Sequence, residues 1–210
     1  LVGSEMCIRD RYNFMKKIKP TIVVVISYGQ IIPKEFLDLS KNGFLNIHAS
    51  ILPKFRGAAP IQRAIMSQDT ETGISFMKID ENLDTGPVLK TYKIKIDEDL
   101  NATELEEKLS QLAALKIIEN IDSIISGKAN FKEQDHSKAT YAGKINKAEG
   151  KIFWKDSAKK IIGKINGLHP NPGAYFIFEG DRYKILKAEI GNGTGPVSYT
   201  HLRAHETGPY

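Results

Sequence analysis

The sequence is poor in the features that mark several large classes of protein. Its 210 residues include one cysteine, one tryptophan and no apolar run near the roughly 18 residues that a membrane-spanning helix needs. A single cysteine excludes a disulfide framework and a cysteine-based zinc site. Hydrophobic residues make up 41% and charged residues 26% of the chain, which excludes global disorder and collagen-like order. We therefore expect one or two folded domains and no membrane partner.

The net charge of +5 is modest, but it is concentrated in one part of the chain. Residues 13–128 carry 15 basic and 15 acidic side chains, whereas residues 129–190 carry 12 basic and 7 acidic ones. The excess comes from a lysine-rich stretch in which Glu149 and Asp156 are the acidic residues. Its lysines are Lys144, Lys147, Lys151, Lys155, Lys159, Lys160 and Lys164. A polyanionic partner and a solvated lysine face both fit this pattern, and charge alone favours the solvated face.

The two ends of the chain differ from the rest. Residues 1–12 and about 193–210 show neither helical nor strand periodicity and join abruptly to periodic sequence. We expect both ends to be foreign to the native protein and leave them out of the fold prediction. The remainder then has no cysteine, which is compatible with a reducing cytoplasm.

Residues 13–128 are predicted to form an α/β unit. The run TIVVVIS (21–27) is apolar on both faces, as expected of a central parallel strand covered by helices on each side. Further strands are predicted at 44–48, about 73–79 and 88–96, and the first two strands are separated by a short helix that starts at Pro33.

Two more helices are predicted in this unit. One opens near Pro60, and a longer one starts at Thr103, where Thr-x-x-Glu to Glu106 makes a capping box, and ends at Gly127. The longer helix has an apolar stripe. The stripe is predicted to contain Leu105, Leu109, Leu112, Leu115, Ile118, Ile121 and Ile125.

The C-terminal third is predicted to contain a linker and a small β-rich module. Residues 129–149 are polar and aperiodic, which is typical of a basic inter-domain linker. In residues 150–192 a short helix capped by Asp156 or Ser157 precedes a hairpin of strands at 174–178 and 182–188. Two strands cannot form an independent sheet domain, so we expect the chain to stop inside this module.

Three polar residues are candidates for catalysis. Asn46 and His48 lie two apart on a predicted strand, so their side chains leave the same face near its C-terminal end. An amide and an imidazole there can stabilise the oxyanion formed from a carbonyl. Asp84, in the turn between two predicted strands, could keep the histidine protonated or move a proton. Taken singly, a structural role remains the more common explanation for each residue.

Other chemistries find little support. The cysteine-free part of the chain offers no Cys-His or Ser-His pairing for a covalent intermediate, and no HExxH, P-loop or GxGxxG motif is present. Direct transfer of an activated acyl group to an amine fits the three candidates better.

The run NIHASILPKFRGAAPIQ (46–62) resembles the signature of the folate-dependent formyltransferases, and in particular the branch that formylates methionyl-tRNA. Four further stretches agree with that branch in order and spacing. They are VVVISYGQIIP (23–33), ETGISFMKIDENLDTGPVL (71–89), ATYAGKINKAEGKIFW (139–154) and INGLHPNPGAYF (165–176).

The resemblance implies a fold and a set of roles. The fold would be a partial Rossmann-like formyltransferase domain (13–128) followed by the start of an OB-fold-like β-barrel domain. Asn46, His48 and Asp84 match the family's catalytic residues. Segment 50–53, with Ser50, Ile51, Leu52 and Pro53, matches its folate-contacting segment. Arg56 and Gly57 lie on the same loop, where Arg56 could touch substrate phosphate or solvent and Gly57 would supply an unusual backbone conformation.

The implied reaction is formyl transfer from 10-formyltetrahydrofolate to the amino group of methionyl-initiator tRNA, for translation initiation in a bacterial-type cytoplasm or an organelle. No metal and no DNA are expected, and the protein would be a monomer. Lys144, Lys147 and Lys151 would contact tRNA phosphates. A nucleotide-sugar amine as acceptor, or folate and tRNA binding without turnover, stays open.

The resemblance also implies that this chain is a fragment. The family's first strand, several βα units and an insertion loop would all precede residue 13, and most of the C-terminal domain would follow the last predicted strand. A parallel sheet without its first strands exposes a pairing edge, so we expect this chain to be poorly stable and of doubtful activity.

Overall fold

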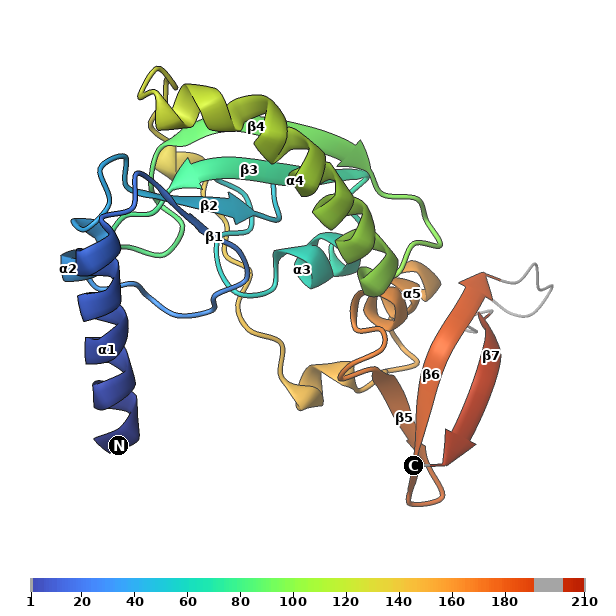
Figure 1. The fold of residues 1–210 in the computed structure, drawn as a ribbon. Helices are drawn as coiled ribbons and strands as arrows, with labels where there is room; N and C mark the ends of the chain where they lie inside the picture. The colour runs from blue at the N-terminus through green and yellow to red at the C-terminus, as the bar shows by residue number, and fades with distance from the viewer. Residues whose placement is uncertain (1, 191–201, 210) are drawn as a thin grey trace. The chain divides into compact units, whose positions relative to one another are not determined.

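The computed structural model describes residues 2–190 and 202–209, and Figure 1 shows the helices and strands of these residues. The chain forms two compact units that alternate along the sequence. The first unit comprises residues 1–56, 74–92 and 112–140, and the second comprises residues 57–73, 93–111 and 141–210. This division differs from the sequential domains expected from the sequence. The boundaries proposed at 128 and 149 stay a prediction.

A four-stranded mixed sheet carries the candidate catalytic residues. Its strands, in spatial order, are β1 (Val23–Val25), β2 (Phe44–His48), β3 (Glu71–Lys78) and β4 (Val88–Lys95). β1 runs parallel to β2, and β2 runs antiparallel to β3. The four predicted strands are confirmed, and so is the short β-helix-β step that joins the first two.

β1 lies at an edge of the sheet, and its predicted central position is wrong among the described residues. Val24 is 40% exposed and Ile26 just beyond the strand is 61% exposed. An apolar run shows that a strand can be covered on both faces, but it does not show which segments will cover it. The outer edge of β1 therefore presents unpaired backbone groups beside apolar side chains.

β2 and β3 form the buried middle of the sheet. Every residue of β2 except Asn46 is buried, and β3 is buried from Thr72 to Met77. Phe76 and Leu45 are 0% and 1% exposed, so water is excluded around the strand that holds Asn46 and His48. Hydrogen bonds made there are stronger than they would be at the surface.

Three helices precede or connect these strands. They are α1 (Val2–Ile18), α2 (Lys34–Leu37) and α3 (Pro60–Met66). α2 and α3 confirm the helices predicted at Pro33 and Pro60, whose prolines occupy the N-cap and the first helical position. α1 was not predicted, since residues 1–12 lack an apolar stripe. The helix contains no proline, and Gly3 is its only glycine, so every residue has a backbone N–H that can form a helical hydrogen bond.

The long predicted helix is α4 (Ala102–Ile125), but its cap and its stripe differ from the prediction. The capping box is made by Asn101 and Glu104, whose side chains bond each other's backbone N–H groups at 3.1 and 3.0 Å. Asparagine is the better N-cap, and it lies two residues before the predicted threonine. None of the described helices has the length and apolar character needed to cross a membrane.

The buried stripe of α4 follows Leu105, Leu109 and Ile124, whereas Leu115 and Ile118 are 63% and 73% exposed. The predicted stripe took three-residue steps repeatedly. Each such step falls about 60° short of a full turn, so the stripe drifts off the buried face.

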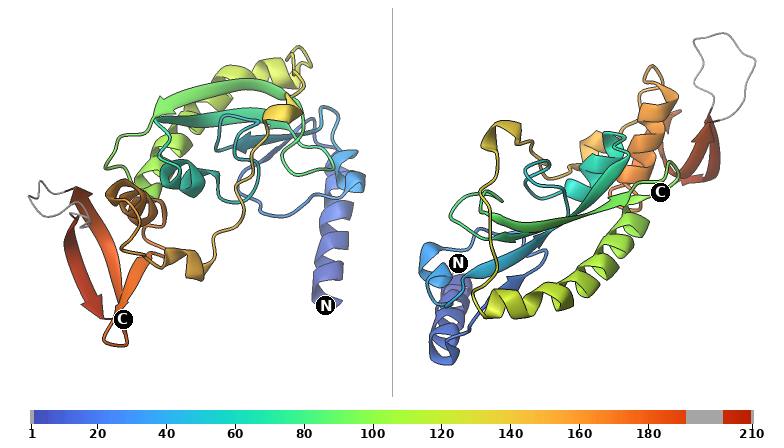
Figure 2. Two further views of the ribbon diagram at one scale, coloured as in Figure 1. Left: turned by 180° about the vertical axis from the view of Figure 1, so that it is seen from behind. Right: turned by 90° about the horizontal axis from the view of Figure 1, so that it is seen from above.

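The C-terminal half of α4 lies along one face of the sheet (Figure 2). Asn42 donates to the carbonyl of Ile124 at 2.9 Å, and Asn120 donates to the Tyr92 hydroxyl at 2.7 Å. Both bonds lie within the first unit. Gly127 then ends the helix with a φ of +72°, as predicted.

The segment predicted as a linker is irregular apart from two short 3-10 turns, η1 (His136–Lys138) and η2 (Lys147–Gly150). A helix, α5 (Ala158–Gly167), follows with Ser157 as its N-cap, as predicted. Of the two proposed caps, the structure thus uses the serine, whose oxygen accepts the N–H of Lys160 at 3.3 Å.

The C-terminal module is a three-stranded antiparallel sheet of β5 (Ala174–Phe178), β6 (Asp181–Ile190) and β7 (Leu202–Pro209). The first two strands confirm the predicted hairpin, whereas β7 lies in the end segment where no strand was expected. Residues 191–201 and 210 of that segment lie outside the described residues. The core of the module contains Ile152, Ile161, Ile165, Ala174, Ile185 and Ala188.

Arg63 of α3 clamps the chain segment that ends in η2, and both belong to the second unit. Its guanidinium bonds both carboxylate oxygens of Glu149, at 2.5 and 3.2 Å, and the carbonyl of Gly143 at 3.0 Å. Glu149 also completes a capping box with Asn146. The hydrogen bond from Arg63 lowers the pKa of Glu149 below its ordinary value.

Replacing Arg63 with methionine should destabilise the protein by about 1–3 kcal/mol, because Glu149 would lose a bidentate partner. Because folding lowers the pKa of Glu149, the stabilisation is present above its ordinary pKa of 4.5 and is lost as the pH falls through the native value. Urea unfolding followed by the fluorescence of Trp154 at neutral and acidic pH measures both effects.

Lys108→Met is the matched control, since it breaks the exposed Lys108–Asp97 pair in the same unit. It should cost about 0.5 kcal/mol or less. Equal losses for the two variants, or a loss for Arg63→Met that persists unchanged in acid, would contradict the clamp.

Candidate active site

β2 presents Asn46 and His48 from one face, as the spacing predicted. The strand pairs with β3 in a register that sets Asn46 opposite Met77 and His48 opposite Ser75. Because residues two apart on a strand share a face, the imidazole and the amide lie side by side. His48 is 6% exposed, so its ring is held by protein groups.

The turn between β3 and β4 brings Asp84 to these side chains. The backbone of Asp84 has a φ of +52°, in the left-handed region that residues other than glycine seldom adopt. Thr85 donates to the Asp80 carboxylate at 2.7 Å, which ties the turn to its own start. A Cβ at Gly86 would lie 2.0 Å from the carbonyl oxygen of Lys78, so the close approach of the two backbones requires glycine there.

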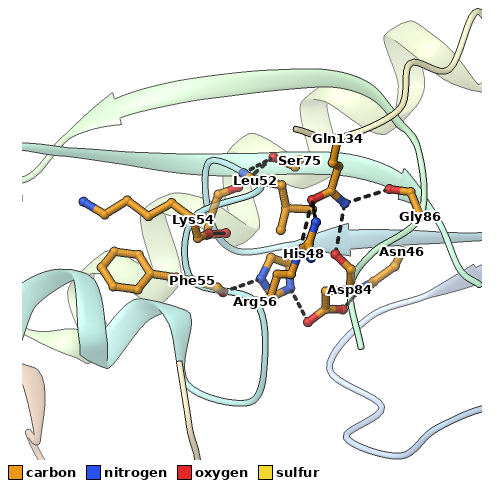
Figure 3. A network of polar contacts seen from close by, with 11 residues as sticks. Asn46, His48, Leu52, Lys54, Phe55, Arg56, Ser75, Asp84, Gly86 and Gln134 are labelled. Carbon is orange, nitrogen blue, oxygen red and sulfur yellow. Dashed lines mark hydrogen bonds and ion pairs between the residues drawn. The ribbon is translucent and has the colours of Figure 1, made fainter. Parts of the chain in front are cut away.

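The three predicted catalytic residues meet at the Asp84 carboxylate (Figure 3). The Asn46 amide donates to one carboxylate oxygen at 3.5 Å, and the His48 Nδ1 lies 3.6 Å from the other. These distances exceed the usual 2.7–3.2 Å of a strong hydrogen bond. The amide and the ring thus face one carboxylate.

The other ring nitrogen of His48 is also engaged. Nε2 lies 2.9 Å from the carbonyl oxygen of Phe55 and therefore donates to it. Both ring nitrogens thus face protein oxygens, which fixes the orientation of the imidazole.

The loop from Ser50 to Pro53 is tied down by its own polar groups. The Ser50 hydroxyl donates to the carbonyl of Lys54 at 2.6 Å, and Ser75 donates to the carbonyl of Ser50 at 2.7 Å. Ser50 is completely buried and Leu52 is 8% exposed, while Ile51 and Pro53 are partly exposed. The side chains of Ser50 and Leu52 therefore shape this loop from within.

Arg56 is buried, which corrects the expectation that it could meet substrate phosphate or solvent. It is 2% exposed. Its Nε and Nη2 donate to Oε1 of Gln134 at 3.2 and 2.7 Å, and Nη2 lies 3.0 Å from Nδ1 of His136. A guanidinium on an accessible loop is usually solvated, but this one is consumed by protein partners.

Gln134 belongs to the site, and the sequence reasoning missed it. It is 8% exposed and lies in the segment predicted as a linker. Its Nε2 donates to the carbonyl oxygens of Asp84 at 3.0 Å and Gly86 at 2.7 Å (Figure 3). A lone glutamine in aperiodic sequence carries no pattern that would reveal such contacts.

Gly57 has the unusual backbone expected of it. Its φ is +114°, and a Cβ would lie 2.9 Å from the carbonyl oxygen of Ala142. This positive φ confirms the prediction that Gly57 supplies an unusual backbone conformation.

Lys144, Lys147 and Lys151 are exposed. The first two line a recess of about 700 Å³ in the second unit, together with Arg182 and Asn171. No acidic side chain lines this recess among the described residues, so it is a basic surface hollow. Lys151 lies outside its lining, with Nζ 5.8 Å from the ring centre of Phe153.

Within the described ranges, 2–190 and 202–209, no group of three or more His, Cys, Asp and Glu side chains gathers closely enough to hold a metal ion.

Two family models match the chain. The first, described as formyl transferase, covers residues 9–121, and the second, described as formyl transferase C-terminal domain, covers residues 144–205. The first alone covers more than half of the chain.

Individual relatives agree with these matches. The chain is 59% identical over 189 residues to the methionyl-tRNA formyltransferase of Pelagibacter ubique, covering 90% of this chain and 61% of that protein. It thus spans about three fifths of the length of the relatives it matches.

Solved structures share the fold. The methionyl-tRNA formyltransferase from Clostridium thermocellum superposes with a TM-score of 0.71 at 22% identity, over 95% of this chain and 82% of that one. WlaRD, a sugar 3N-formyl transferase solved with dTDP and 5-N-formyl-THF, gives 0.71 at 23% identity, over 85% and 65%. With both family models, these likenesses confirm the predicted fold class, and the chain belongs to the formyl transferase family.

Proposed function

We propose that this chain carries the reaction centre for formyl transfer from 10-formyltetrahydrofolate to the amino group of methionyl-initiator tRNA. One observation carries the proposal: Asn46, His48 and Asp84 converge in a chain that is 59% identical to a methionyl-tRNA formyltransferase. The activity would serve translation initiation in a bacterial-type cytoplasm.

The convergence supports a division of labour. The methionyl amine attacks the formyl carbon, and the formyl oxygen becomes an oxyanion that Asn46 and His48 stabilise. The new carbon–nitrogen bond forms in this addition, and collapse of the oxyanion then restores the formyl carbonyl and breaks the bond from the formyl carbon to the folate nitrogen. Asp84 holds His48 in place and passes the amine proton toward the departing nitrogen. The donor is a formamide with an aryl-amine leaving group, and the proposed transfer uses no metal.

The segment 50–53 is proposed to contact the folate donor. Ile51 and Pro53 are the partly exposed members of this loop, whereas Ser50 and Leu52 face inward. Structural relatives support a folate ligand, since WlaRD was solved with 5-N-formyl-THF. We infer that the two exposed side chains make the apolar contact and that the buried pair holds the loop in shape.

The exposed lysines are proposed to bind the acceptor. Lys144 and Lys147 line the basic recess with Arg182, and Lys151 lies nearby in sequence on the same surface-exposed segment. Such side chains neutralise nucleic-acid phosphates without reading bases. Arg56 is withdrawn from this set because its guanidinium is buried.

A nucleotide-sugar amine is the second candidate acceptor, because WlaRD shares the fold and acts on a sugar amine. The higher identity to the tRNA-directed relative favours tRNA. Incubating the chain with formyl-labelled donor and either methionyl-initiator tRNA or a dTDP-amino sugar decides between them. Label in the sugar alone, or in neither acceptor, would contradict the proposal.

Asp84→Asn should lower kcat by about 100-fold or more, because the isosteric amide can neither charge the histidine nor accept a proton. Formylation of methionyl-tRNA at saturating donor measures the effect. Glu81→Gln is the control on the same turn, since Glu81 makes an exposed pair with Lys34 at 2.9 Å and should leave kcat unchanged. Near-normal turnover by Asp84→Asn, or loss of activity on chelating divalent metals, would rule out this mechanism.

Replacing Lys144, Lys147 and Lys151 together with glutamine should weaken tRNA binding and flatten the dependence of log K on log salt, by up to about three units of slope. Fluorescence titration of labelled tRNA at several salt concentrations gives the slope.

The control removes the same charge from the exposed residues Lys34, Lys41 and Lys128 of the first unit. An equal slope for both triple variants would mean that the three proposed lysines are merely solvated.

A further inference from the structure

The side chain of Gln134 is fully engaged. A primary amide offers two N–H donors and an oxygen with two lone pairs. Gln134 uses both donors, on the carbonyls of Asp84 and Gly86, and its oxygen accepts two bonds from Arg56. An apolar or shorter side chain would leave several buried polar groups without a partner.

These bonds reach the part of the turn that carries Asp84. Asp84 holds a left-handed conformation, and the internal bonds of Thr85 and Asn82 both end on Asp80, at the start of the turn. The two carbonyls on either side of Thr85 are fixed from outside by Gln134. The position of the Asp84 carboxylate therefore depends on that contact.

The surroundings of Gln134 are built to hold it still. It is a buried side chain between exposed neighbours on both sides. The chain is pinned just before it by the pairing of Lys132 with Val88, at 2.8 and 2.9 Å. Just after it, Asp135 caps η1, and hydrogen bonds led by that from the Ser137 hydroxyl hold the pKa of Asp135 at about 2. The segment is thus anchored at both ends of the glutamine.

We propose that Gln134 is a positioning residue, which holds the Asp84 carboxylate against Asn46 and His48 from the segment beyond α4. The inference rests on the proposed function for its catalytic meaning. Gln134 touches none of the proposed reacting atoms and acts through the backbone of the turn. Arg56, buried beneath it, fixes the orientation of its amide by occupying Oε1.

Two substitutions test the bonds from Gln134 to the turn, one with and one without an acceptor for Arg56. Gln134→Glu keeps an acceptor for Arg56 but turns an oxygen toward the two carbonyls, and Gln134→Met removes all four bonds at similar volume. Both should lower kcat by about 10- to 100-fold, because small misplacements of a catalytic group are costly, with KM changed by less than about threefold. Glu133→Gln, at the exposed preceding residue, is the control and should match the unaltered protein.

A double-mutant cycle shows whether Gln134 acts through Asp84. In the Asp84→Asn background, Gln134→Glu should cause little further loss of kcat, because the group that it positions has already been disabled. Losses that multiply, or a change confined to KM, would overturn the proposal.

Hydrogen–deuterium exchange provides a readout that needs no turnover. Backbone amides of residues 80–88 should exchange at least about tenfold faster in Gln134→Glu than in Glu133→Gln, since the turn loses its external support. Unchanged exchange in that turn would overturn the proposal. Faster exchange in a chain that transfers no formyl group would instead refute the proposed function and leave the positioning role intact.

Discussion

A buried guanidinium organises the candidate site. Arg56 is almost fully withdrawn from water, and a charged group in that position must be surrounded by hydrogen-bond acceptors. Gln134 meets that need, and in doing so it directs its own amide at the turn that carries Asp84. One side chain thereby joins the turn that carries Asp84, the loop after β2 and the segment beyond α4. The desolvation cost of the arginine is offset by contacts that also order the candidate site.

Much of the fold could be predicted because it rests on local chemistry. The period of two in β2, the prolines before α2 and α3, and the serine cap of α5 each act over a few residues, and each lies where the pattern placed it. The predictions that failed did so for two reasons. The edge position of β1 depends on which segments pair with it. The cap and the stripe of α4 follow from local geometry, but Asn101 is a better N-cap than Thr103 and repeated three-residue steps leave the buried face.

The residues of the candidate site also fall into those that local sequence predicts and those that it does not. Asn46 and His48 could be predicted to lie together because strand geometry relates residues two apart, and the turn residue Asp84 was found through its motif. Arg56 and Gln134 meet across a sequence separation of 78 residues, and a single sequence holds no trace of that contact. Its place on a loop suggested that Arg56 contacts substrate, but the side chain is buried and bonds Gln134 instead. Long-range polar partners are what a single sequence conceals best.

The alternation of the two compact units has a practical meaning for work on this chain. The chain passes from one unit to the other five times, within or beside β3, β4 and α4 as well as before the C-terminal module. Truncation after residue 140 would therefore leave the C-terminal product without residues 57–73 and 93–111, which belong to the second unit. Expression boundaries chosen from the order of family domains would divide the second unit, and separate expression of that unit would require its three segments to be joined directly to one another rather than a single cut.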